Sequence, residues 1–463
     1  MSVSTRKWLV LFAVGMGTFM TALDGSVVNS IIPIITRDLH TDTATIEWVA
    51  TTYLLVVSGL LLTFGRLGDL YGHKVNYLSG FVIFLGGSIG CSYAPATGWL
   101  IFWRAVQALG GAMLYANGPA ILTTTFPPER RGLVLGLQAT MTYLGLTVGP
   151  SLGGWLTDAF GWRSIFLINI PVAILCVSVG LFAIAYDRQK GRQEKFDLPG
   201  ALIYMVGFSA LLFGMNRAHD WGWVSLLTIG TLIGSLALLA AFILWEKRSP
   251  APMLDLGLFR SATFNASVGS AVINYICMYT VTFMLPFFLI DGRGMTPTHS
   301  GLVLIAQPII MAIVVPLSGS LSDRIGTHRL TVTGMAVMVI GLTVLSFGGA
   351  TTPLWLTILG LLINGLGIGI FISPNNSALM GSAPAGRQGI AAGMLATART
   401  SGQALGIGIA GAIFNTYLAA NTPGAFYAGI STALRVAAAA AVLGALVASL
   451  RDRPAGVGNQ ARQ

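Results

Sequence analysis

The sequence predicts an all-α protein that spans a membrane many times. Of its 463 residues 54% are hydrophobic and only 9% are charged, and the mean hydropathy is +0.76. Soluble proteins carry about 25% charged residues, so this chain cannot cover a globular surface with solvated groups. Its apolar runs are continuous and lack the alternation of barrel strands, which indicates helices. Soluble enzymes and nucleic-acid-binding proteins are thereby excluded, despite a net charge of +10.

Runs of about 20 apolar residues, the length that crosses a bilayer, occur fourteen times. They lie near 8–32, 47–65, 76–95, 98–124, 133–157, 163–186, 199–216, 223–245, 263–290, 299–321, 329–349, 353–380, 389–416 and 427–450. We expect four parts: a six-helix bundle over 1–187, two inserted helices with cytoplasmic linkers over 188–262, a second six-helix bundle over 263–450, and a cytoplasmic tail over 451–463.

The basic residues predict the orientation of these spans. With the N-terminus inside, 19 of the 26 Lys and Arg residues fall on inner segments, four fall on outer loops and three lie within spans. Inner loops of membrane proteins carry this excess. The pattern predicts a multi-pass protein of the bacterial inner membrane with both termini in the cytoplasm.

Two loops reveal an internal repeat. The segments 65–74 (GRLGDLYGHK) and 319–329 (GSLSDRIGTHR) share the frame G-x3-D-x2-G followed by basic residues, at an offset of 254. Each copy follows the second span of its half, so the two six-helix halves are parallel repeats. Carriers that work by alternating access have this design, with a site near the midplane.

Four segments resemble signatures of the major facilitator superfamily. Segment 65–74 is similar to its loop between helices 2 and 3, 22–33 (ALDGSVVNSIIP) to the LDxTIVNxALP motif, 103–112 to the RxxQGxGAA motif, and 145–154 (GLTVGPSLGG) to the antiporter motif GxxxGPxxGG. Together with the inserted pair, they narrow the resemblance to the 14-helix drug:proton antiporters. Leu70 and His73 stand where the family commonly has basic residues.

The resemblance implies roles for two groups of residues. In the gating loop, Asp69 would cap a helix that starts near Gly389; a simple tight turn is the alternative. The gating residues are Gly65, Asp69, Gly72, Lys74, Asp323 and Arg324. The antiporter motif consists of Gly145, Gly149, Pro150, Gly153 and Gly154, for which ordinary helix packing is the alternative, since proline bends a helix and glycines allow close approach.

Asp24 is the one acidic residue well inside a predicted span. A carboxylate at mid-bilayer costs about 2.5 to 3.5 kcal/mol on insertion scales, so such residues are functional by default. Asp24 is therefore our candidate proton carrier. Arg104, at a similar depth in the fourth span, is its candidate partner. The alternatives are a structural hydrogen bond for Asp24 and a snorkelling side chain for Arg104.

Uncharged polar and aromatic residues in the spans suit a cavity for amphipathic compounds. The candidate substrate-binding residues are Asn29, Gln107, Asn274, Tyr275, Tyr279, Phe283, Gln307, Asn364 and Arg399.

These features predict a proton-coupled antiporter that exports amphipathic drugs or antibiotics. A proton-coupled importer (symporter) of small organic solutes such as peptides is the alternative, although the ExxER motif of the peptide symporters is absent from the first span. A membrane enzyme or sensor is a third possibility that no catalytic cluster favours. The proton gradient is the expected energy source, with no cofactor, and the three cysteines have no metal-site spacing. We expect a monomer that binds small molecules, protons and lipid, and no nucleic acid.

Overall fold

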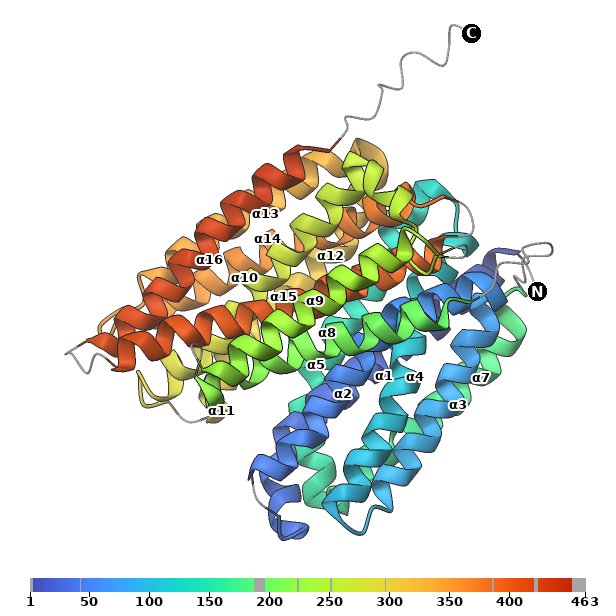
Figure 1. The fold of residues 1–463 in the computed structure, drawn as a ribbon. Helices are drawn as coiled ribbons and strands as arrows, with labels where there is room; N and C mark the ends of the chain where they lie inside the picture. The colour runs from blue at the N-terminus through green and yellow to red at the C-terminus, as the bar shows by residue number, and fades with distance from the viewer. Residues whose placement is uncertain are drawn as a thin grey trace, which may run out of the picture. The chain divides into compact units, whose positions relative to one another are not determined.

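The computed structural model describes residues 3–41, 43–186, 196–222, 225–249, 252–295, 297–384, 387–419 and 424–451. Within these ranges the chain forms helices and no strand (Figure 1). The inner linker with Arg188, Lys190, Arg192 and Lys195, and nearly all of the predicted tail, lie outside the described residues.

The helix bounds are α1 (Val3–Asp38), α2 (Thr43–Tyr71), α3 (His73–Ser92), α4 (Thr97–Thr125), η1 (Pro128–Arg130), α5 (Arg131–Phe160), α6 (Ser164–Leu167), α7 (Asn169–Ala183), α8 (Leu198–Trp221), α9 (Leu226–Glu246), η2 (Leu256–Arg260), α10 (Ala262–Ile290), α11 (Pro297–Leu304), α12 (Ala306–Ile325), α13 (Thr327–Ser346), α14 (Leu354–Ser382), α15 (Gln388–Ala419) and α16 (Ala425–Ser449).

Twelve helical segments in the described part of the chain are long and apolar enough to cross a membrane. The expected count of fourteen spans is therefore not supported. The two predicted spans near 98–124 and 389–416 do form the helices α4 and α15, but neither is among the twelve. Both carry an arginine and a glutamine together with many glycines, which lowers their mean hydropathy.

Two predicted spans are interrupted by a break, and proline accounts for both. The predicted span 163–186 divides at Ile168 into α6 and α7, and the span 299–321 divides at Ile305 into α11 and α12. A proline ring clashes with the carbonyl four residues earlier. The carbonyl four residues before Pro171 belongs to Leu167, the last residue of α6. The carbonyl four residues before Pro308 belongs to Leu304, the last residue of α11.

The chain divides into two compact units. The first comprises Met1–Asp255 and Pro384–Thr400, and the second Leu256–Ala383 and Ser401–Gln463. The inserted helices α8 and α9 pack on each other and belong to the first unit, where α8 also packs on α2. The first turns of α15 belong to the first unit and the rest of that helix to the second.

Equivalent glycines pack equivalent helix pairs in the two units. In the first unit a Cβ on Gly110 of α4 would overlap the backbone of Gly80 and Phe84 on α3. In the second unit, Gly367 of α14 stands in the same relation to the backbone of Gly334 and Met338 on α13. These residues correspond at offsets of 254 and 257, so the repeat seen in the loops extends to helix packing.

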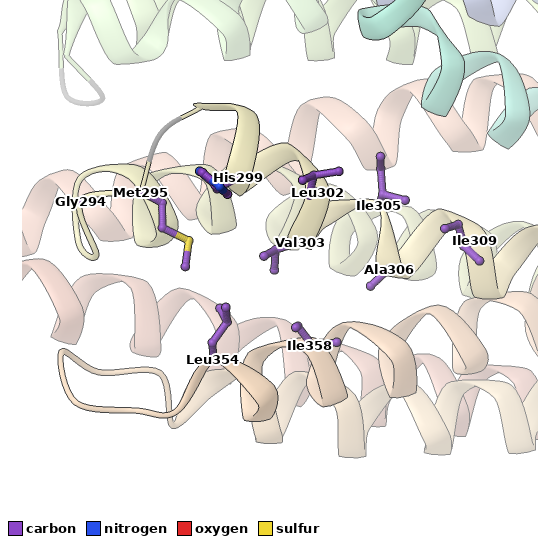
Figure 2. Close-up of a pocket in the computed structure, with 10 residues that line it drawn as sticks. All are labelled: Gly294, Met295, His299, Leu302, Val303, Ile305, Ala306, Ile309, Leu354 and Ile358. Carbon is purple, nitrogen blue, oxygen red and sulfur yellow. The ribbon is translucent and has the colours of Figure 1, made fainter.

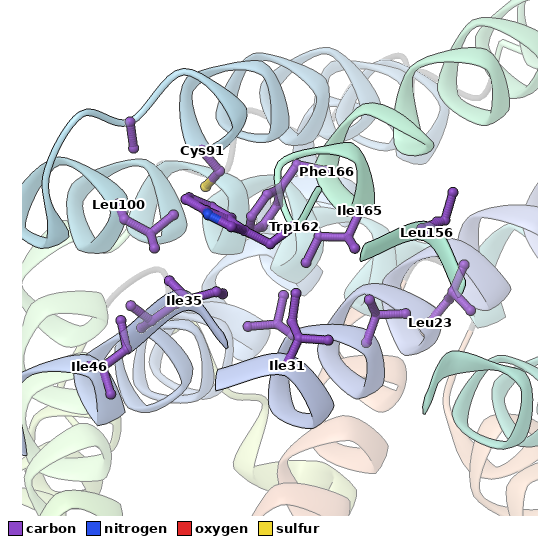
Figure 3. Close-up of a cluster of buried hydrophobic side chains, with 14 residues drawn as sticks. Leu23, Ile31, Ile35, Ile46, Cys91, Leu100, Leu156, Trp162, Ile165 and Phe166 are labelled. Carbon is purple, nitrogen blue, oxygen red and sulfur yellow. The ribbon is translucent and has the colours of Figure 1, made fainter. Parts of the chain in front are cut away.

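An apolar core joins α1, α2, α3, α4, α5 and α6 in the first unit (Figure 3). The Trp162 indole belongs to this core and donates a hydrogen bond to Asp38 Oδ2 at 2.8 Å, while Arg163 pairs with the same oxygen at 3.0 Å. These two hydrogen bonds lower the pKa of the Asp38 carboxyl. Asp38 thus ties the end of α1 to the turn before α6.

Candidate functional site

Asp24 and Arg104 form a buried ion pair in the first unit. The Arg104 guanidinium donates from Nη1 to Asp24 Oδ2 at 2.6 Å, and the exposed fractions of the two residues are 1% and 3%. Asp24 is contributed by α1 and Arg104 by α4. A buried pair of this kind is tolerated only where further hydrogen bonds satisfy its remaining polar atoms.

Three uncharged side chains supply those hydrogen bonds. Gln107 and Asn169 each donate to Asp24 Oδ1, at 2.9 and 3.1 Å, and each also donates to Ser88 Oγ, at 2.7 and 3.2 Å. Gln107 lies one turn after Arg104 on α4 and accepts a second bond from its Nη1 at 2.6 Å. We call Asp24, Ser88, Arg104, Gln107 and Asn169 the Asp24 network.

The Asp24 network draws on four helices, and two of its members were not predicted. Ser88 lies on α3 and Asn169 is the first residue of α7. The proline break before α7 was a signal for Asn169, because it frees the start of that helix inside the bundle. Ser88 gives no signal, since single serines are common in packed membrane helices.

Two aromatic rings also lie close to the Arg104 guanidinium. Its Cζ lies 4.3 Å from the centre of the Tyr53 ring and 6.0 Å from that of Phe166. The Tyr53 hydroxyl is buried without a hydrogen-bond partner in the described part of the chain. The aromatic contacts help to hold the cation away from water.

The gating loop places Asp69 at the start of α15. The Asp69 oxygens accept hydrogen bonds from the backbone N–H groups of Gly389 at 2.8 Å and Ile390 at 3.1 Å. Gly65 and Gly389 allow this approach, because a Cβ on either would overlap the carbonyl of the other. All of these residues belong to the first unit.

Other residues of the gating loop and of its second copy have the following conformations and contacts. Gly72 has a φ of 100°, which favours glycine, and Lys74 donates to the Leu181 carbonyl at 2.7 Å. In the second copy, Asp323 is half-buried and Arg324 is exposed. The turn after them has a φ of 86° at Gly326.

The antiporter motif lies directly against α1 on both sides of Asp24. A Cβ on Gly145 would be 3.0 Å from the Leu23 backbone nitrogen, and one on Gly149 would be 2.6 Å from Ser26 Cβ. Ser26 also donates to the Leu146 carbonyl at 2.9 Å. Gly153 is buried and Gly154 faces open space, whereas the side chain of Pro150 lies outside the described part.

The predicted substrate-binding residues of the second unit have the following contacts. Asn364 donates to Gln307 Oε1 at 3.4 Å, while Asn274 faces the sulfur atoms of two methionines at 3.7 Å. The Oδ1 atoms of both asparagines are buried without a partner in the described part. Tyr275 is buried, and Tyr279 and Phe283 are half-buried on the same helix, α10.

Two further candidates belong to the first unit. Arg399 is half-buried, with its Cζ 5.5 Å from the centre of the Tyr115 ring. Asn29 lies on α1, but its side chain is outside the described residues.

A shallow apolar groove of about 580 Å³ lies in the second unit, between α11–α12 and the start of α14 (Figure 2). It is lined by Gly294, Met295, His299, Leu302, Val303, Ile305, Ala306, Ile309, Leu354 and Ile358. None of the predicted site residues is among them.

Comparison with known protein families identifies the family to which this chain belongs. The sequence profile of the Major Facilitator Superfamily matches residues 14–407 and 267–462. The chain belongs to that superfamily. It is therefore a multi-pass membrane transporter, and its relatives are transporters rather than enzymes.

The names of individual relatives of this chain refer to different transport activities. The chain is 35% identical to the riboflavin transporter RibZ of Clostridioides difficile, over 89% of each chain. It is 32% identical to the multidrug resistance protein Stp of Mycobacterium tuberculosis, over 90% of this chain and 78% of Stp. The solved structure of the human organic anion transporter MFSD10 shares the fold, with a TM-score of 0.69 at 12% identity, over 96% of this chain and 99% of that one.

Proposed function

We propose that this superfamily member is a proton-driven antiporter that exports amphipathic organic compounds from the cytoplasm. The observation that carries the proposal is the Asp24 network. It holds an acid–base pair at 2.6 Å, with Asp24 inside the candidate membrane segment Thr5–Val28, where charge is costly and marks function. The antiporter motif packed against α1 around Asp24, and the name of the relative Stp, support export.

In the mechanism we propose, Asp24 alternates between charged and neutral forms. Protonation from the outside removes its attraction for Arg104, and the amides of Gln107 and Asn169 remain as polar neighbours. This neutralisation favours return of the empty carrier to its inward-facing state. Substrate binding and proton release to the cytoplasm re-form the ion pair. The membrane potential adds about 2.3 kcal/mol per net charge per 100 mV.

Three finer features belong to this proposal. We place both termini in the cytoplasm of a bacterial inner membrane, as the basic residues predict. We assign the chain to the 14-helix drug:proton antiporters. In that arrangement α4 and α15 also cross the bilayer, and neighbouring helices shield their polar residues from lipid, as for Arg104 and Gln107.

The substitution Asp24→Asn tests the proposal in proteoliposomes with an imposed pH gradient. It preserves the shape of the side chain but cannot bind or release a proton, so gradient-driven export should fall to the background rate. Asp158→Asn, the same change at an exposed site on α5, should transport normally. Full gradient-driven transport by the Asp24 variant, with normal folding, would remove Asp24 from the mechanism.

A carrier of riboflavin-like compounds is the second candidate, because RibZ is 35% identical over 89% of the chain. Transport of riboflavin and of a cationic dye in inverted and right-side-out vesicles separates the candidates. Accumulation in inverted vesicles with an acidic lumen supports export, whereas accumulation only in right-side-out vesicles supports import.

A further inference from the structure

The ends of the inserted helix pair bring two buried carboxyl groups together. Asp197 directly precedes α8, and Glu246 is the last residue of α9. The Trp245 indole donates to both Asp197 oxygens, at 3.1 and 2.9 Å, which joins the two helix ends. Asp197 and Glu246 are only 7% and 3% exposed.

The two carboxyl groups differ in their hydrogen bonds. Asp197 Oδ1 also accepts from the Gly200 N–H at 2.9 Å, so two N–H donors together reach both of its oxygens. Glu246 Oε2 accepts from the Leu254 N–H at 2.9 Å. Glu246 Oε1 is buried and has no partner in the described part of the chain. Burial of that oxygen disfavours the ionised carboxylate, and the backbone of Met253 and the charge of Arg66 oppose this only in part.

The position of Gly200 gives an upper limit for the distance between the two carboxyl groups. A Cβ on that residue would lie 2.8 Å from Glu246 Oε1 and 2.9 Å from Asp197 Oδ2, so these oxygens are at most 5.7 Å apart. Two buried carboxylates this close disfavour each other's ionisation. Both Asp197 oxygens accept hydrogen bonds, whereas Glu246 Oε1 accepts none in the described part of the chain, so the proton belongs on Glu246.

Two further charged groups bear on this arrangement. Arg66 of α2, only 1% exposed, attracts the Glu246 carboxylate and opposes the effect of Asp197. Asp255, which follows Leu254, is directed to Arg387 at 3.6 Å. Arg66 lies in the gating loop, three residues before Asp69, so the charge on Glu246 acts on the segment that holds the start of α15.

We propose that Glu246 is a second proton-binding site, which couples the inserted helices to the gating loop. The unpartnered Glu246 Oε1 atom has no exposed surface at which a water molecule or a metal ion could bind. A proton can bind there because it does not require exposed surface. The ligand is a proton bound to Oε1 and released to water, which leaves a carboxylate between Asp197 and Arg66. The site rests on the proposed function in one respect: the proposed topology puts it at the cytoplasmic end, where antiported protons leave.

Infrared difference spectroscopy of the purified full-length protein tests this inference without transport. At neutral pH, wild type minus Glu246→Gln should show the carbonyl stretch of one protonated carboxylic acid. The matched control Glu129→Gln removes an exposed glutamate of η1 and should instead remove a carboxylate band. A carboxylate band lost from Glu246→Gln at neutral pH would overturn the proposal.

A second variant keeps the test decisive if Glu246→Gln fails to fold. Asp197→Asn removes the neighbouring negative charge, so the acid band should disappear on raising the pH at a value about one unit lower than in wild type. An unchanged titration would overturn the proposed coupling. Neither readout depends on Asp24, so a failure of proton-driven export leaves this result interpretable on its own.

Discussion

At the scale of single residues, the Asp24 network shows which functional polar residues of a membrane protein can be predicted from its sequence and which cannot. Asp24 and Arg104 could be found because each charge in an apolar run is costly enough to demand a reason. Ser88 could not, because uncharged polar residues are common in membrane helices, and for Asn169 the only signal was the proline break before α7. Glu246 was missed for a related reason: it ends its helix, and its burial depends on the segment at Leu254.

The contribution of Asn169 can be measured by truncation. Asn169→Ala removes one of the two donors to Asp24 Oδ1 and leaves a buried charge less well solvated. Hydrogen bonds to charged groups contribute about 1.5 to 3 kcal/mol, and we expect the free energy of unfolding in detergent to fall by that amount. Asn265→Ala, at an exposed asparagine of α10 that donates to the Phe259 carbonyl at 2.6 Å, removes a bond to a neutral group that water can replace, so it should lower this free energy less. Equal effects of the two substitutions would contradict the importance assigned to the network.

At the scale of helices, the positions of nearly all elements followed from apolar runs, and the exceptions have local causes. The breaks at Ile168 and Ile305 are consequences of prolines inside those runs. The helices α4 and α15 were predicted where they occur, but their polar residues remove them from the twelve segments that hydropathy alone supports. A helix shielded by its neighbours can carry such residues, and sequence length and hydropathy do not show that shielding.

Two adjacent glycines on α3 offer a matched test of helix packing. A Cβ on Gly87 would lie 2.5 Å from the Gln107 backbone nitrogen, whereas one on Gly86 would meet nothing within 4 Å. Gly87→Val must therefore push α3 away from α4 and displace Gln107 from Asp24. Overpacking of this kind costs about 1 to 3 kcal/mol, so we expect a lower unfolding temperature and loss of gradient-driven transport. Gly86→Val shares the change in helix propensity and should keep both.

At the scale of the whole molecule, α15 is shared by the two compact units. Its first turn is held in the first unit by Asp69, through two backbone N–H groups at the positive end of the helix dipole. The internal repeat predicted two related halves, but it could not predict this division, because the helix interacts with residues more than 300 positions away. Since Asp69 and the first turns of α15 both belong to the first unit, the hold of Asp69 on α15 must change if the start of that helix moves within the first unit during transport.

The substitution Asp69→Asn tests that requirement. It removes the negative charge at the start of α15, and such an interaction is worth about 0.3 to 1 kcal/mol, or up to about 2 when partly buried. We expect a cysteine placed at Met394, near the start of α15, to react several-fold faster with a water-soluble maleimide, and the transport rate to fall. Asp323→Asn makes the same change in the second copy of the loop and should leave the labelling at position 394 unaltered. If Asp69→Asn labels at the wild-type rate, the hydrogen bonds of Asp69 do not control the start of α15, and its role reduces to that of a turn residue.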